Sequence, residues 1–186
     1  MTMCGIVGYI GTEQAAPIIL DGLSKLEYRG YDSAGMAIFD GEKINTRKAV
    51  GRLKVLENLT HGGENMKGTS GIGHTRWATH GAPSDINSHP HMNNAGTIAV
   101  VHNGIIENYI PLKKKMQDKG YQFVSETDTE VLAHLLDYYY KGNPLEAITK
   151  VLHRVEGSYA LGIMFADQPD KIFAARKDLS LIHISE

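Results

Sequence analysis

Apolar residues in this chain of 186 residues follow two kinds of pattern. The first is a short, nearly continuous apolar run bounded by glycine or polar residues, which is typical of a buried strand. Such runs predict strands at 5–10, 34–39, 97–102, 159–165 and 172–175, and a further strand that starts at 71 and ends in a glycine-bounded loop. Asp40-Gly41 predicts a turn after the second of these strands.

The second pattern is an apolar residue at every third or fourth position, which predicts amphipathic helices. One helix is expected from an N-cap at Thr12 to near Gly30, and another from Asn108 to Gly120. A Thr-x-x-Glu capping box at 127–130 predicts the start of a third, and Asn143-Pro144 the start of a fourth. The stretch 51–65 is polar and irregular, and no element is predicted there.

Strands precede and follow helices without a regular strand–helix alternation, so we expect a layered α+β domain rather than a doubly wound sheet. The length fits one domain with a substantial core, and the sequence shows neither an internal repeat nor an interdomain linker.

Composition narrows the function classes. The net charge is −2, and the short lysine run at 113–115 is interpreted as a solvated helix face, so no nucleic-acid partner is expected. No apolar run is long enough to span a bilayer and no signal peptide is recognised, so no membrane association is expected. One cysteine rules out an internal disulfide framework and fits the reducing cytoplasm, where we expect the protein.

That single cysteine, Cys4, lies almost at the amino terminus. If the preceding residues are removed, its α-amine becomes a base with a pKa of about 7.7–8.0, whereas a peptide nitrogen accepts no proton. Nucleophile and base would then belong to one residue. The alternative is an inert thiol that fills a core beside Ile6 and Val7.

Three other polar positions also allow two interpretations each. Asn103-Gly104 is a hairpin turn signal, but an amide and a backbone N–H can also bind an oxyanion. Arg76 fits either a surface charge or a carboxylate-binding fork. Asp128 fits either the start of a helix or a site for a substrate ammonium.

Four histidines lie within eighteen positions: His74, His80, His89 and His91. The sequence has no second cysteine and no Glu-x-x-His motif at the spacing of a zinc site, and Pro90 fixes the backbone between His89 and His91. We therefore expect structural hydrogen bonding and no metal site.

Taken together, five ordered motifs are far more specific than any one of them. They are Cys-Gly-Ile-Val-Gly at 4–8, Tyr-Arg-Gly-Tyr-Asp-Ser at 28–33, His-Thr-Arg-Trp-Ala-Thr-His-Gly at 74–81, His-Asn-Gly at 102–104 and Ser-Glu-Thr-Asp-Thr-Glu at 125–130. The chain resembles the class II, N-terminal-nucleophile glutamine amidotransferases from Cys4 to about Lys177. This resemblance implies a four-layer αββα sandwich and no cofactor.

At the positions of Tyr31 and Trp77 the chain resembles one subfamily of these enzymes. That subfamily transfers ammonia to a sugar phosphate, fructose-6-phosphate, with the help of a separate isomerase domain. The amidophosphoribosyltransferases usually carry glutamine and tyrosine at these two places and rank second.

The resemblance implies that L-glutamine is the substrate and assigns its chemistry. Cys4 would attack the side-chain amide to give a thioester, while the Asn103 side chain and the Gly104 N–H form the oxyanion hole. Arg76 would bind the substrate α-carboxylate and Asp128 its α-ammonium.

The remaining roles implied by the resemblance are supporting ones. Trp77, Thr79 and His80 would belong to a loop that closes over glutamine, with Gly73 and Gly81 as places where it bends. Arg29 would lie near the nucleophile.

The chain departs from the family pattern at both ends. Met-Thr-Met precedes the cysteine, so a start at Met3 or further processing is needed to free its amine. After Asp178 the family continues with Ser-Pro-Leu and more strands, whereas 179–186 do not match it. We therefore interpret 4–178 as the amidotransferase domain and expect it to lack closing strands and the isomerase half. At most a glutaminase, or else an inert fragment, would remain.

Overall fold

The computed structural model describes residues 4–27, 32–77 and 81–178. Its strands are β1 (Gly5–Ile10), β2 (Ser33–Phe39), β3 (Ile44–Val50), β4 (Ser70–Arg76), β5 (His91–Met92), β6 (Ile98–Ile106), β7 (Gly157–Phe165) and β8 (Phe173–Lys177). Its helices are α1 (Ala15–Ser24), α2 (Leu53–Leu59), α3 (Tyr109–Gln117), α4 (Glu130–Tyr139) and α5 (Pro144–Leu152), with a 3₁₀ turn η2 (His61–Gly63).

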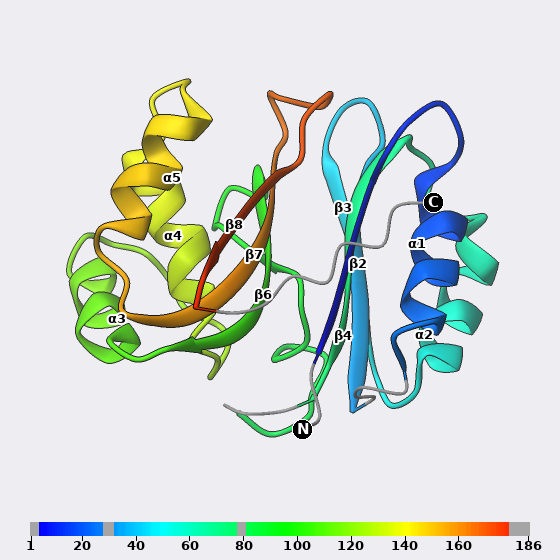
Figure 1. The fold of residues 1–186 in the computed structure, drawn as a ribbon, viewed down its shortest axis with the longest axis horizontal. Helices are drawn as coiled ribbons and strands as arrows, with labels where there is room; N and C mark the ends of the chain where they lie inside the picture. The colour runs from blue at the N-terminus through cyan, green and yellow to red at the C-terminus, as the bar shows by residue number, and fades with distance from the viewer. Residues whose placement is uncertain (1–3, 28–31, 78–80, 179–186) are drawn as a thin grey trace.

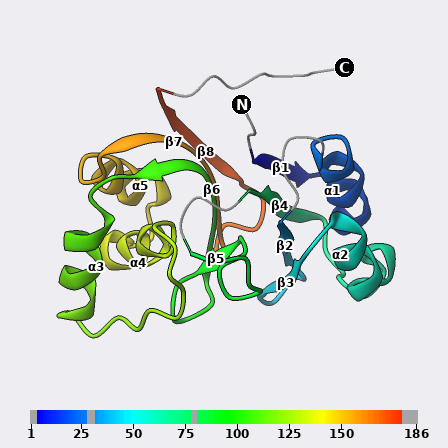
Figure 2. The ribbon, with the colours of Figure 1, turned by 90° about the horizontal axis from the view of Figure 1, so that it is seen from below.

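The strands form two antiparallel sheets that face each other between two layers of helices (Figures 1 and 2). The first sheet has the order β1-β4-β2-β3 and the second β5-β6-β7-β8. Helices α1 and α2 cover the outer face of the first sheet, and α3, α4 and α5 lie on the outer side of the second (Figure 1). The expected four-layer αββα arrangement is therefore confirmed.

Each space between layers holds its own apolar core. The first helical layer packs on its sheet through residues such as Ile19, Leu23 and Met36. The two sheets meet through a smaller cluster that includes Ile72, Val101 and Met164. The largest cluster lies between the second sheet and its helices, where α4 is buried along most of its length. Both faces of each sheet are thus covered, which explains the near-continuous apolar runs in the sequence.

The stretch 51–65, predicted to be irregular, instead contains α2 and η2. Leu53 and Leu56 are buried against the first sheet, and the Leu53 N–H donates to the Glu27 carboxylate at 3.1 Å. Strand β3 was also not predicted, because its sequence is mostly polar. It forms because it pairs with β2 over seven residues, from Ser33↔Val50 to Phe39↔Ile44.

Two predicted details at the starts of helices are wrong. Helix α1 begins at Ala15 with Gln14 as N-cap, and not after Thr12. Helix α4 begins at Glu130 after Thr129, so 127–130 is not a capping box. The Glu130 carboxylate instead accepts hydrogen bonds from the N–H groups of Val124 and Ser125.

The helix expected after Asn143-Pro144 is confirmed as α5, and the Asn143 side chain accepts the N–H of Glu146 at 3.2 Å. The expected α3 is also confirmed, between Asn108 and Asp118. In the part of the chain that the structure describes, no helix has the length and apolar character needed to cross a bilayer.

Candidate active site

Cys4 lies immediately before β1, at the end of the sheet where β4 finishes. The antiparallel register Gly5↔Thr75 brings residue 4 beside the last residues of β4. The N–H of Trp77 donates to Cys4 Sγ at 3.2 Å, and Sγ lies 3.6 Å from the Trp77 carbonyl oxygen. The Gly5 N–H donates to Thr75 Oγ1 at 3.2 Å, which fixes the backbone next to the thiol.

The environment of Cys4 raises the pKa of its thiol. Burial is the main cause and the charge of Asp32 adds to it, while the Trp77 backbone and the charge of Arg76 act in the opposite direction. A thiol with a raised pKa is protonated at neutral pH, and only the thiolate is strongly nucleophilic. Any nucleophilic reaction of Cys4 near neutrality therefore needs a base to accept the proton.

Asn103 reaches Cys4 from the opposite sheet. Its Nδ2 donates to the Cys4 carbonyl oxygen at 2.9 Å, although 99 positions separate the two residues. The interpretation of Asn103-Gly104 as a hairpin turn is wrong, because both residues lie inside β6 and pair with Ala160 and Tyr159. The structure thus joins the thiol-bearing residue to the amide that the resemblance places in an oxyanion hole.

Gly104 adopts a backbone conformation that its side-chain-free Cα permits. Its φ is +116°, and a Cβ at this position would collide with the carbonyl oxygen of Ser158 on β7. Glycine is required here for both reasons. Despite the positive φ at Gly104, β6 continues to pair with β7 as far as Ile106↔Gly157.

Arg76 ends β4 and is buried, with 3% of its surface exposed. Its Nη2 donates to the carbonyl oxygen of Gly81 at 3.0 Å, and its charge lowers the pKa of the nearby Cys4 thiol. Trp77, the next residue, is 45% exposed. A buried guanidinium beside the thiol can attract an anionic group of a small molecule.

Asp128 is buried directly before α4. Its Oδ2 accepts the N–H of Ile106 at 2.7 Å, and the Thr129 hydroxyl donates to Oδ1 at 3.5 Å. The carboxylate is therefore anchored to the same strand, β6, that carries Asn103 and Gly104. Ile106, whose N–H binds this carboxylate, lies on β6 two positions after Gly104.

Three residues implied by the resemblance, Arg29, Thr79 and His80, lie outside the described residues. Gly73 lies inside β4, paired with Val7 and Met36, so it is not part of a bending loop there. Gly81, with φ +76°, accepts the Arg76 hydrogen bond and retains the geometry that favours glycine.

The sequence alone assigned no role in the site to His74 and His102, which lie close to Asn103 on the side away from Cys4. His74 Nε2 is 2.8 Å from Asn103 Oδ1, and His102 Nδ1 is 2.8 Å from Thr129 Oγ1. The sequence pointed to these two residues only through the clustering of histidines, which we interpreted above as a question of metal binding. Across the described ranges, no group of three His, Cys, Asp or Glu side chains is arranged to hold a metal ion.

The histidines instead form a buried stack. The rings of His74 and His89 lie 4.2 Å apart and nearly parallel, and His91 meets His89 edge-on at 4.9 Å. Burial lowers the pKa of His74 and His91 to about 3, and that of His89 well below its usual value. All three are therefore neutral at physiological pH.

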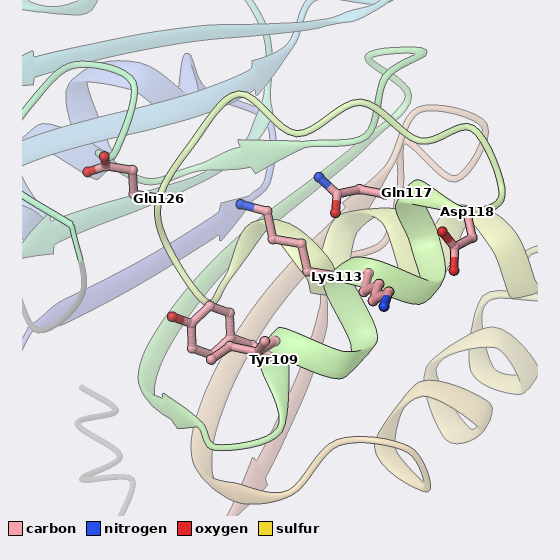
Figure 3. Close-up of a pocket in the computed structure, with 7 residues that line it drawn as sticks. Tyr109, Lys113, Gln117, Asp118 and Glu126 are labelled. Carbon is pink, nitrogen blue, oxygen red and sulfur yellow. The ribbon is translucent and has the colours of Figure 1, made fainter.

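A surface pocket lies elsewhere, along α3 (Figure 3). Tyr109, Lys113 and Gln117 face it from the helix, and Glu126 faces it from the opposite segment. Lys113 Nζ donates to the Ser125 carbonyl oxygen at 3.2 Å. None of the residues that line this pocket is a predicted site residue.

Comparison with known proteins decides the family. A family described as "Glutamine amidotransferase domain" matches residues 74–182, which is more than half of the chain. The chain belongs to the glutamine amidotransferase family. The recognition of a class II, N-terminal-nucleophile domain made from the five motifs is confirmed.

The chain is similar in sequence to part of several longer proteins. It is 65% identical to a protein of Caldanaerobacter subterraneus and 64% identical to one of Clostridium tetani, both named glutamine–fructose-6-phosphate aminotransferase (isomerizing). Each match covers 97% of this chain and 29% of the relative. The chain therefore spans less than a third of the length of these relatives.

Solved structures agree with the fold. The glutamine phosphoribosylpyrophosphate amidotransferase of B. subtilis is 33% identical, with a TM-score of 0.75, over 87% of this chain and 35% of that one. A glutamine aminotransferase class-II domain protein of Silicibacter pomeroyi is 18% identical, with a TM-score of 0.58, over 81% of this chain and 71% of that one, and shows the fold alone.

Proposed function

We propose that residues 4–178 form a domain that hydrolyses the side-chain amide of L-glutamine at Cys4. We further propose that, in a longer enzyme with an isomerase domain, the ammonia converts fructose-6-phosphate to glucosamine-6-phosphate. The observation that carries the first proposal is the contact of Asn103 Nδ2 with the backbone of Cys4, beside the buried Arg76. The names of the relatives at 64–65% identity support the second.

The proposed reaction has two steps. The Cys4 thiol gives its proton to a base and its sulfur attacks the amide carbon, so that the carbonyl oxygen becomes an oxyanion. Collapse of this intermediate breaks the C–N bond, releases ammonia with the transferred proton and leaves a γ-glutamyl thioester. Water then adds to the thioester, and its cleavage yields glutamate and restores the thiol.

The protein groups would act at defined points of this sequence. Nδ2 of Asn103 and the N–H of Gly104 would donate to the oxyanion, where loss of one donor typically costs about 2.7–4 kcal/mol of barrier. The base would be the α-amine of Cys4 itself when this residue begins the mature chain. Its ordinary pKa of about 7.7–8.0 suits proton exchange near neutral pH.

Recognition of free glutamine would come from opposite charges. Arg76 would bind the α-carboxylate and Asp128 the α-ammonium, which together select a free amino acid over a glutamine inside a peptide. Trp77, Thr79 and His80 would contribute to closure over the substrate, and Arg29 would support the nucleophile. The single cysteine supports a cytoplasmic location, and the net charge of −2 gives no support for a nucleic-acid partner.

A second candidate is the glutaminase part of an amidophosphoribosyltransferase, favoured by the TM-score of 0.75 to such a structure. Its sequence identity of 33% is about half of that to the isomerizing aminotransferases. The gene sequence downstream of this domain separates the two, because a phosphosugar isomerase domain supports the first candidate and a phosphoribosyltransferase domain the second.

Glutamine hydrolysis tests the proposed chemistry. We expect a chain whose mature first residue is Cys4 to release glutamate and ammonia, and Cys4→Ala to lose this activity by more than about 1000-fold. The electrophile 6-diazo-5-oxo-norleucine should label the active chain once, at its single cysteine, as intact mass would show. Ammonia release by Cys4→Ala would overturn the proposal.

The terminal amine is tested separately. A chain that retains Met-Thr-Met before Cys4 has a peptide nitrogen in place of the amine, so we expect it to be nearly inactive on glutamine. Intact mass and ammonia release should be measured on the same sample. Full turnover by the unprocessed chain would show that another group accepts the thiol proton.

A further inference from the structure

The amide of Asn103 can donate to an oxyanion only if its nitrogen, and not its oxygen, faces the thiol. An asparagine side chain carries an acceptor and a two-hydrogen donor at equivalent positions, so its neighbours must select one orientation. In this structure Nδ2 faces Cys4 and Oδ1 faces His74. The question is what holds the amide in that orientation.

His74 reaches the amide across the interface between the sheets. It lies on β4, in the interior of the first sheet, while Asn103 lies on β6, in the interior of the second. His74 Nε2 lies 3.0 Å from the carbonyl oxygen of His102 and 2.8 Å from Asn103 Oδ1. A backbone carbonyl is always an acceptor, so Nε2 must carry the hydrogen.

The tautomer of His74 follows from its surroundings. Only 1% of the residue is exposed, and burial lowers its pKa to about 3, so the ring is neutral and holds a single proton. That proton is on Nε2, and Nδ1 is left as an unprotonated nitrogen with no hydrogen-bond partner among the described residues. The ring therefore presents a fixed donor to Asn103.

Packing keeps this donor in place. The ring of His89 stacks on that of His74 at 4.2 Å. Gly35, the partner of His74 in the β2–β4 register, leaves room for the chain at His89, whose carbonyl oxygen would collide with a Cβ there. The imidazole is thus held between neighbouring elements without a charged partner.

If the Asn103 amide were rotated by 180°, a donor would face a donor at His74 and an acceptor would face an acceptor at Cys4. Its nitrogen would face the Nε2–H of His74, and its oxygen would face the carbonyl oxygen of Cys4. Both contacts would lose a hydrogen bond in a partly buried place, which would leave polar groups on each side unsatisfied. In the observed orientation one hydrogen of Nδ2 bonds to the Cys4 carbonyl oxygen at 2.9 Å.

We propose that His74 is a positioning residue for amide hydrolysis, whose Nε2–H orients the Asn103 amide so that Nδ2 faces Cys4. This inference rests on the proposed glutaminase function. His74 acts through Asn103 and does not touch the reacting atoms. Its removal should therefore lower kcat and leave the KM for glutamine within about threefold, because the oxyanion forms only in the transition state.

A double-mutant cycle tests the inference. We expect His74→Leu to lower kcat about 10- to 100-fold, and Asn103→Ala about 100- to 1000-fold. In the Asn103→Ala background, His74→Leu should change kcat by less than about threefold, because the group it orients is gone. Equal losses in both backgrounds would indicate a merely structural role and overturn the inference, as would an unchanged kcat of His74→Leu.

Two further comparisons keep the test decisive. His74→Gln can place an amide donor near the position of Nε2 and should restore kcat to within about fivefold of the parent, whereas the shorter His74→Asn should not. This pair replaces His74→Leu if that variant fails to fold, and equal kcat values for Gln and Asn would then overturn the inference. His134→Leu, which removes a fully buried histidine on α4, is the control for packing loss.

The two proposals fail in different ways. A parent chain with Cys4 as its first residue that releases no glutamate overturns the proposed function, and this inference with it. An active parent whose activity does not depend on position 74 overturns this inference only.

Discussion

At the scale of single residues, Gly104 shows how a backbone requirement and a chemical requirement coincide. Its φ of +116° is strained for any other residue, and the space beside its Cα is filled by the Ser158 carbonyl. Because it follows Asn103 directly, any shift that relieves such a collision also moves the amide. The same residue therefore limits both the stability of the second sheet and the geometry of the candidate oxyanion site.

Gly104→Ala is expected to lower the free energy of unfolding by about 3 kcal/mol, from φ strain and overpacking together, and to reduce glutaminase activity. Gly120→Ala is the matched control, because Gly120 also has a positive φ, +90°, but a Cβ there meets no atom within 4 Å. It should cost only about 1 kcal/mol. Urea unfolding measures both, and equal losses would show that the Ser158 contact carries no cost.

At the scale of elements, β6 gathers the candidate site. It carries Asn103 and Gly104, and its last residue, Ile106, anchors the Asp128 carboxylate at the start of α4. A local turn signal suggested that the strand ends at His102. Pairing with β7 over nine residues overrides that signal, because the hydrogen bonds of an antiparallel ladder outweigh a two-residue turn preference.

The capping of α5 is a local feature that can be tested by itself. Asn143→Ala removes the acceptor for the Glu146 N–H and should lower the free energy of unfolding by about 1 kcal/mol. Asn143→Asp keeps an acceptor and should cost much less. Chemical denaturation compares the two variants, and an equal loss for both would mean that the side-chain acceptor at this position is not the source of the stabilisation.

At the scale of the whole molecule, the two sheets enclose polar residues as well as apolar ones. Ile72, Val101 and Met164 fill part of the space between the sheets, while His74, from the first sheet, bonds to β6 in the second. The buried histidine stack is neutral, so its polar atoms carry no charge into the interior. This arrangement has a consequence for acid stability.

The folded protein should lose stability as pH falls below about 6.5. An unfolded histidine takes up a proton near that pH, whereas His74 and His91 have a pKa of about 3 when folded. Between these values the unfolded chain binds more protons, so each such histidine lowers the free energy of unfolding by about 1.4 kcal/mol per pH unit.

Denaturation midpoints measured from pH 7 to pH 4 test this dependence. His91→Gln should reduce the slope by about the contribution of one histidine, and the exposed His61→Gln should leave it unchanged. If both variants show the parent slope, the buried histidines are not the source of the acid sensitivity.

The sequence by itself determined the layered α+β class, most of the strands and helices and, through five motifs, the amidotransferase family. These are properties of local periodicity and of residue identity, both of which are present in the chain before it folds. The sequence also supplied Cys4, Asn103, Gly104, Arg76 and Asp128 as candidates, although each kept a structural alternative.

Tertiary structure decided the rest. It made β3 from a polar segment through its pairing with β2, extended β6 through Asn103-Gly104, and brought Nδ2 of Asn103 to the Cys4 backbone across 99 positions. It also placed His74 behind that amide. No local pattern encodes these contacts, because each depends on the register of two sheets that meet only when the chain is folded.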